Sequence, residues 1–109
     1  MKQAFIRFLN LKQTLTITPK ELDATAVQLL EVCASKSHTG KRLTVTDAMK
    51  LQTIASPATI HRKLTQLIDA DYLSLEYEGR NRRTKYLTPT QKSNDYFTKL
   101  GELFIQSSI

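Results

Sequence analysis

The stretch Ser56-Pro57-Ala58-Thr59-Ile60-His61-Arg62-Lys63-Leu64-Thr65-Gln66-Leu67-Ile68-Asp69-Ala70-Asp71-Tyr72 decides how this chain of 109 residues is organised. Ser56 is a favourable N-cap residue, and Pro57 follows at the first helical position, which needs no N–H donor. An apolar stripe then recurs at helical spacing, formed by Ile60, Leu64, Leu67 and Ile68. Such a stripe has to be buried, so the sequence predicts a helix over residues 57–70 with one side against a core.

The other side of this predicted helix carries small, hydrogen-bonding or cationic residues near its N-terminal end. They are Ala58, Thr59, His61, Arg62 and Thr65. A helix that enters the major groove of DNA presents such a side. Arg62 has a planar fork of two donors that can pair with O6 and N7 of guanine, whereas Ser56 and the first-turn amides are placed to favour a phosphate. Two alternatives stay open: Arg62 as an ordinary surface cation near Asp69 or another acid, and His61 as an ordinary exposed histidine.

Length and composition indicate one globular domain over residues 1–109. The hydrophobic fraction is 40% and the charged fraction 24%, with only three Gly and three Pro. The lone Cys33 lies on the apolar side of a predicted helix, which favours a small buried side chain and a reducing, cytoplasmic setting. Charges interrupt every apolar run near the N-terminus, so we expect neither a signal peptide nor a membrane span.

The first third of the chain predicts two helices. Residues 1–15 form an amphipathic segment whose Phe5 and Phe8 need cover, which a second copy of the chain could give. The signal Thr18-Pro19-Lys20-Glu21 resembles a capping box and predicts that a helix begins there and runs to about Ser35. Residues 36–41 read as the loop that ends it.

The next segment predicts a short strand, a short helix and a turn. Residues 42–45 are β-branched and brief, which is typical of a strand, and Thr46 can cap a helix over residues 47–52. Residues 53–55 then form a turn before Ser56. Two short helices joined by a turn, the second with a polar face, are typical of a helix-turn-helix.

Two strands and a final helix follow. Apolar and polar residues alternate over residues 72–77, and residues 84–87 supply a partner strand. Residues 78–83 between them hold Gly79 and Asn81, which favour a hairpin turn with positive φ. Thr88-Pro89 then resembles a helix start, and apolar residues predict an amphipathic helix over residues 89–106. The predicted fold class is therefore α+β, mainly helical: a winged helix-turn-helix with a short strand and a two-stranded β-hairpin wing.

Positive charge is unevenly placed. The chain has 16 Lys and Arg against 10 Asp and Glu, a net charge of +6. Residues 79–94 contain no acid, and their cations are Arg80, Arg82, Arg83, Lys85 and Lys92. A local basic cluster on a hairpin tip indicates contact with phosphates, although a solvated surface kept positive for solubility is an alternative.

A family resemblance rests on four pieces of the chain. They are Leu-Thr-Val-Thr-Asp-Ala-Met at 43–49, Ser-Pro-Ala-Thr-Ile-His-Arg-Lys-Leu at 56–64, Ala-Asp-Tyr-Leu at 70–73, and Arg-Arg-Thr-Lys-Tyr-Leu-Thr-Pro-Thr at 82–90. Together they resemble the DNA-binding half of MarR-type transcriptional regulators. The resemblance implies that Ser56, Pro57, Thr59, His61 and Arg62 face the major groove. It further implies that Arg80, Arg82 and Arg83 on the wing reach the DNA backbone or the minor groove.

We therefore expect a regulator that binds double-stranded DNA as a homodimer through residues 2–15 and 89–106. Its DNA-binding residues are Ser56, Pro57, Ala58, Thr59, His61, Arg62, Thr65, Arg80, Arg82, Arg83 and Lys85. We expect no enzyme, cofactor or metal site, because Asp69 and Asp71 point apart on a helix and the histidines and cysteine lack metal-ligand spacing. Alternatives are a winged helix that binds a protein, or one that binds RNA or serves plasmid replication. The sequence leaves open whether a small-molecule effector binds.

Overall fold

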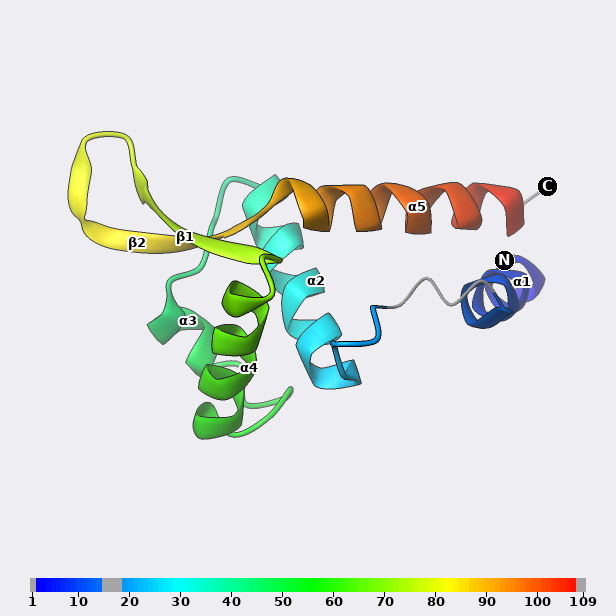
Figure 1. Ribbon diagram of the computed structural model, residues 1–109, viewed down its shortest axis with the longest axis horizontal. Helices are drawn as coiled ribbons and strands as arrows, with labels where there is room; N and C mark the ends of the chain where they lie inside the picture. Colours follow the sequence, from blue (N-terminus) through cyan, green and yellow to red (C-terminus); the bar gives the residue numbers. More distant parts are fainter. Residues whose placement is uncertain (1, 15–18, 108–109) are drawn as a thin grey trace.

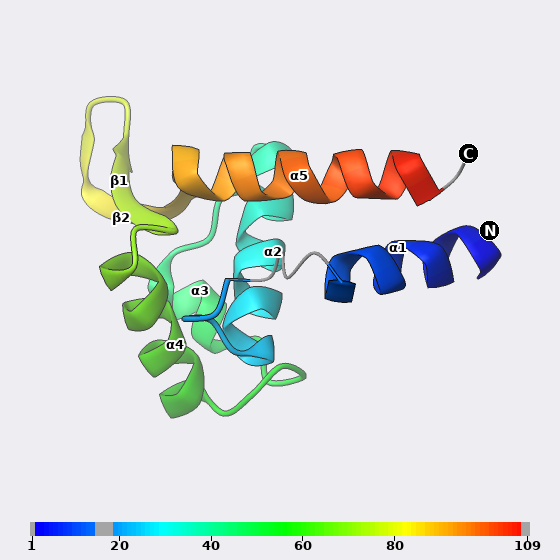
Figure 2. The same ribbon diagram turned by 45° about the vertical axis from the view of Figure 1, so that its right-hand side comes forward.

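The computed structural model describes residues 2–14 and 19–107, with side chains for 2–10 and 19–107. In chain order the elements are α1 (Lys2–Thr14), α2 (Ala24–His38), α3 (Val45–Met49), α4 (Pro57–Asp69), β1 (Leu73–Glu78), β2 (Asn81–Pro89) and α5 (Gln91–Ser107). Helices α2, α3 and α4 cluster together, the hairpin of β1 and β2 extends at one end, and α1 lies at the other end beside the C-terminal half of α5 (Figures 1 and 2). The described chain is thus α+β and mainly helical, as predicted.

Helix α2 begins at Ala24, so the predicted start at Pro19 is wrong. Asp23 is the N-cap, and its Oδ1 accepts the N–H of Ala26 at 2.9 Å. The preceding residues form a turn in which Leu22 N–H donates to Pro19 O at 3.2 Å. Leu22 before the cap and Val27 four positions into the helix are both buried in the core, as in a hydrophobic staple. Thr18 lies outside the described residues.

Helix α3 also begins earlier than predicted, and no strand forms at residues 42–45. Thr44, rather than Thr46, is the N-cap: its Oγ1 accepts the N–H of Asp47 at 3.0 Å, and the Asp47 carboxylate accepts the N–H of Thr44 at 3.2 Å. This reciprocal capping box outweighs the β-branched composition of the segment. The extended residues before it still reach the hairpin, because Leu43 O accepts the N–H of Leu87 at 2.7 Å.

Helix α4 begins where the sequence predicts. Ser56 is its N-cap and Pro57 its first residue, and the helix ends at Asp69. The residue that turns the chain into β1 is Asp71, whose φ of 66° lies in the left-handed region that few non-glycine residues adopt. Asp is one of the residues that tolerates this conformation, so the helix can stop and the strand can start within three residues.

The hairpin is longer than predicted, with a tighter turn. Residues 84–87 form only the middle of β2, which pairs with β1 from Leu73↔Pro89 to Tyr77↔Lys85 and again at Glu78↔Asn81, with an irregularity between these pairs. Gly79 has φ 55°, as the turn requires, whereas Asn81 lies within the strand. Because Pro89 still pairs with β1, α5 begins at Gln91 instead of residue 89 and extends to Ser107.

The core is built between α2, α4, the base of the hairpin and the start of α5. Ile60, Leu64 and Leu67 of α4 are fully buried, and Ile68 is half-buried. They belong to one cluster with Leu29, Leu30, Cys33, Leu73, Leu87 and Tyr96. Cys33 is 1% exposed, which confirms the prediction of a buried small side chain, and burial raises the pKa of its thiol to about 12.

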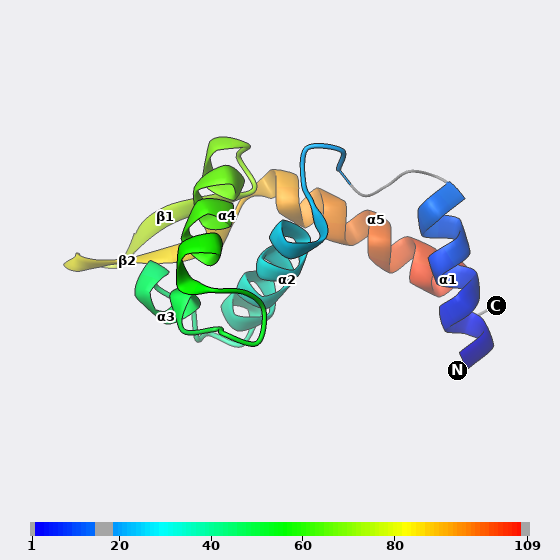
Figure 3. The same cartoon turned by 90° about the horizontal axis from the view of Figure 1, so that it is seen from below.

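Helix α1 packs along the distal part of α5, and no described α1 residue belongs to this core (Figure 3). The rings of Phe8 and Phe104 meet edge to face with centroids 5.9 Å apart. On these two helices large apolar side chains stay exposed, namely Phe5, Ile6, Leu9, Phe104 and Ile105. Among residues 2–14 and 19–107, no helix is long and apolar enough to cross a membrane.

Candidate functional site

Helix α4 presents the side that the sequence singled out. The buried stripe faces α2, and the residues between its members point outward. Ser56, Pro57, Ala58, His61, Arg62 and Thr65 are exposed, and Thr59 is half-buried. All seven predicted residues are therefore accessible, and the spacing of Ala58, His61, Arg62 and Thr65 puts these four on one side of α4.

Hydrogen bonds divide these residues into two groups. The Ser56 hydroxyl accepts the N–H of Thr59 at 3.3 Å and donates to the Thr59 hydroxyl at 3.0 Å. Thr65 donates its hydroxyl to the carbonyl of His61 one turn earlier, at 3.0 Å. These hydroxyls already form hydrogen bonds within the helix, so their main role is to stabilise its N-terminal turns.

Arg62 is different, because its guanidinium forms no hydrogen bond or ion pair with any of the described residues. It lines a hollow of about 550 Å³ together with Asp69, Thr65, Gln66 and Glu21. No ion pair joins Arg62 to Asp69 among the described residues, but both line this hollow, so Arg62 as an ordinary surface cation near an acid stays an alternative. Its five N–H donors remain available to a ligand.

The hairpin carries the second group of predicted residues. Arg80, Arg82, Arg83 and Lys85 are all exposed. Arg82 and Lys85 lie over the ring of Tyr77, at 5.2 and 5.4 Å from its centroid, which orients their side chains by cation–π attraction. The backbone of Arg83 is fixed by its N–H, which donates to Asn81 Oδ1 at 2.9 Å. The hairpin therefore presents four cations on a backbone that is locally constrained.

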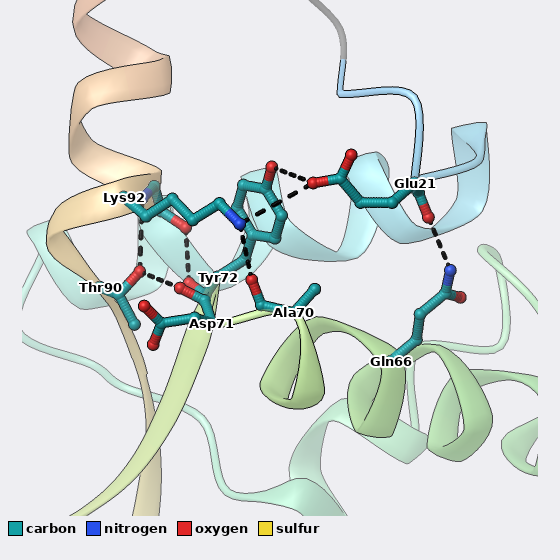
Figure 4. Close-up of polar contacts among 8 residues, drawn as sticks. Glu21, Gln66, Ala70, Asp71, Tyr72, Thr90 and Lys92 are labelled. Carbon is teal, nitrogen blue, oxygen red and sulfur yellow. Dashed lines mark hydrogen bonds and ion pairs between the residues drawn. The ribbon is translucent and has the colours of Figure 1, made fainter.

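Lys92, which the sequence placed with these cations, belongs elsewhere. Its Nζ donates to the carbonyl of Ala70 at 2.9 Å, lies 4.3 Å from the ring centroid of Tyr72, and stands 3.8 Å from Glu21 Oε1 (Figure 4). Lys92 is thus part of the junction between α4, β1 and α5, and the basic cluster of the hairpin ends at Lys85.

Sequence reasoning missed Arg42. Its Nη1 donates to Thr88 Oγ1 at 3.1 Å, lies 4.0 Å from Glu76 Oε2, and its guanidinium carbon stands 5.1 Å from the ring centroid of Tyr86. These contacts tie the segment before α3 to the base of the hairpin. Arg42 and Thr88 are 46 positions apart, so no local signal marks the pair.

Two carboxylates and one phenol near α4 have shifted pKa values. Hydrogen bonds from Lys63 and then from the Ala26 amide lower the pKa of Asp23. The backbone N–H of Glu21 and the Tyr72 hydroxyl lower the pKa of Glu21. Burial, and then the bond to Glu21, raise the pKa of Tyr72 to about 12. Both carboxylates are therefore charged at neutral pH.

The hairpin and α4 lie at the same end of the molecule, opposite α1 (Figures 1 and 3). Among residues 2–14 and 19–107, no group of three or more His, Cys, Asp or Glu is arranged to hold a metal ion. No family model matches the chain, and no curated protein matches its sequence. The residues on α4 and on the hairpin therefore carry the functional argument by themselves.

Proposed function

We propose that this protein binds double-stranded DNA as a winged helix-turn-helix transcriptional regulator. The observation that carries the proposal is the exposed side of α4, whose Arg62 has no hydrogen bond or ion pair to any described residue, at the same end of the molecule as a hairpin with four exposed cations. A chain of net charge +6 with its cations gathered in this way is suited to a polyanion.

The order of elements supports this fold. Helices α3 and α4 follow one another and pack together, and the hairpin follows α4 directly. Residues 50–56 between the helices are more than the three or four of a compact helix-turn-helix, and successive turn hydrogen bonds order them. The resemblance to MarR-type regulators supports the same assignment.

The roles of the residues follow from their chemistry. Arg62 is the residue that we assign to base reading, because its free fork matches guanine O6 and N7. Ala58, His61 and Thr65 flank it on the groove side, and Pro57 with the Ser56 cap brings the helix N-terminus toward a phosphate. Arg80, Arg82, Arg83 and Lys85 on the wing neutralise phosphates or reach the minor groove. We also propose a cytoplasmic location, where the unpaired Cys33 stays reduced.

We further propose that the regulator is a homodimer joined through α1 and the distal part of α5. Phe5 is 54% exposed, and Phe104 is 50% exposed although its ring also meets that of Phe8. Two copies related by a two-fold axis would cover both patches and present two copies of α4 to a palindromic site. Sedimentation equilibrium should give a dimer for the wild type and a monomer for Phe104→Glu; a wild-type monomer at tens of micromolar excludes this dimer.

The experiment for DNA binding is fluorescence anisotropy of a labelled mixed-sequence duplex of about 30 base pairs, at several salt concentrations. If each chain neutralises about five phosphates, the slope of log affinity against log salt is roughly −4 to −5 per chain, and it doubles for a dimer on two half-sites. The triple change of Arg80, Arg82 and Arg83 to Ala should make this slope shallower by about 2 to 3 per chain. Matched single-stranded DNA and double-stranded RNA serve as comparisons. No duplex binding at low salt, or tighter binding to RNA, overturns the proposal.

A further inference from the structure

The segment Glu21–Asp23, between the described turn at Pro19 and helix α2, is bonded to α4 at two points. The side-chain amide of Gln66 donates to the carbonyl of Glu21 at 2.8 Å. One turn earlier on α4, Lys63 forms a hydrogen-bonded ion pair with Asp23. The same segment thus contacts α4 on successive turns, along the side next to the outward-facing residues.

Glu21 also reaches the C-terminal end of α4 through a third connection. Its Oε1 accepts the hydroxyl of Tyr72 at 2.8 Å and lies 3.8 Å from Lys92 Nζ. Lys92 in turn donates to the carbonyl of Ala70, the C-cap residue of α4, at 2.9 Å. Figure 4 shows these side chains meeting where α4, β1 and α5 join. A cation at a helix C-terminus is also favoured by the helix dipole.

These contacts specify the rotation and tilt of α4 more closely than its apolar stripe does. Burial of Ile60, Leu64 and Leu67 fixes which side of the helix faces the core, but apolar contact is non-directional and leaves the rotation and tilt weakly specified. Hydrogen bonds and ion pairs have preferred lengths and angles, so bonds on successive turns specify both. A change of rotation would move the outward-facing guanidinium of Arg62 relative to a base edge.

We propose that Glu21–Asp23 is a latch that sets the orientation of α4, so that Lys63 and Lys92 serve DNA binding as positioning residues and not as DNA contacts. This inference rests on the proposed function. The Lys63 side chain is 16% exposed and its ammonium is paired with Asp23, so it has little surface to offer a phosphate. Lys63 and Lys92 are thereby assigned to holding α4 in place and not to the positive surface that meets DNA.

The test uses Lys63→Met and Asp23→Asn, singly and together, in the duplex titration. Asn keeps the N-cap of α2 but loses the charge, so helix α2 should persist. Each single change should weaken duplex binding about two- to fivefold, the range expected for a partly exposed pair. The double change should cost little more than either one, because both remove the same bond. The salt slope should stay as in the wild type, whereas the comparison variant Arg83→Met on the wing should make it shallower by about 0.9 per chain bound.

The sign of the Asp23→Asn effect separates the latch from a direct contact. If Lys63 bound a phosphate, removing Asp23 would free the ammonium and remove a repulsive acid, so binding would tighten, and Lys63→Met would flatten the slope. That result, or unchanged affinity in both single variants, overturns the proposal. Hydrogen exchange of the α4 amides without DNA tests the latch independently: both variants should exchange faster. If the wild type binds no duplex, the proposed function fails, and unchanged exchange then overturns the latch as well.

Discussion

Replacing Arg62 with alanine separates folding from recognition on α4. The side chain is exposed and has no hydrogen bond or ion pair to lose among the described residues. Its removal should therefore change the free energy of unfolding by no more than about 0.5 kcal/mol, as for an ordinary surface site. Any large loss of DNA affinity must then come from the missing contact.

The size of that loss follows from the chemistry of the fork. A good bidentate contact from arginine to guanine is worth roughly 1–3 kcal/mol, which corresponds to about a 5- to 150-fold loss of affinity for the specific site. Arg62→Lys is the matched control, since it keeps the charge but cannot reproduce the planar pair of donors. It should lose a similar share of specificity while leaving binding to unrelated duplexes unchanged.

The assay begins with selection of a preferred site from a random-sequence duplex pool. Anisotropy competition then compares the selected duplex with a scrambled one for the wild type, Arg62→Ala and Arg62→Lys. Urea denaturation followed by circular dichroism checks the folding of each variant. Equal discrimination in all three proteins, with folding unchanged, would refute base reading by Arg62 and favour a protein partner for this surface.

Three further predictions concern stability and are each measured by urea denaturation. Leu64→Ala should cost about 2–5 kcal/mol, because the side chain is 1% exposed and its removal leaves a cavity beside α2; a cost below about 1 kcal/mol would contradict the core described above. Ser93→Ala should lower the free energy of unfolding by only about 0.5–1.5 kcal/mol. The variant loses the 2.5 Å hydrogen bond to Tyr72 O, but that carbonyl still accepts the backbone N–H of Thr90 at 3.2 Å. A cost above about 3 kcal/mol would mean that the carbonyl is left without a donor. Folding lowers the pKa of Glu21 from 4.5 and that of Asp23 from 3.8. Their contribution to the free energy of unfolding is therefore complete above about pH 4.5 and is lost as the pH falls through the pKa values of the folded state. Glu21→Gln with Asp23→Asn should make the free energy of unfolding less dependent on pH in this acid range. An unchanged pH dependence would exclude both carboxylates as its source.

The elements with strong local signals were predicted well. The Ser56 cap and the apolar stripe of α4 act within a few residues of one another, so the helix and its outward side could be predicted before any tertiary contact was known. The starts of α2 and α3 were predicted wrongly because each helix has two possible N-terminal signals in the sequence. Asp23 and Thr44 each bond a backbone N–H three residues on, and the sequence alone does not rank them against the Thr-Pro and Thr46 signals.

By itself, the sequence thus determined an α+β chain, the polar side of α4 and the cationic hairpin, because periodicity, caps and turn residues act locally. Only the tertiary structure decided which of the cations form hydrogen bonds with distant segments. Lys63 and Lys92 look like Arg62 and Lys85 in the sequence, yet each is bonded to a group 22 or more positions away, at Asp23 and Ala70. Whether a charged side chain faces solvent or a partner depends on which distant segments the core brings beside it. The residues next to it in the sequence do not indicate which segments those are.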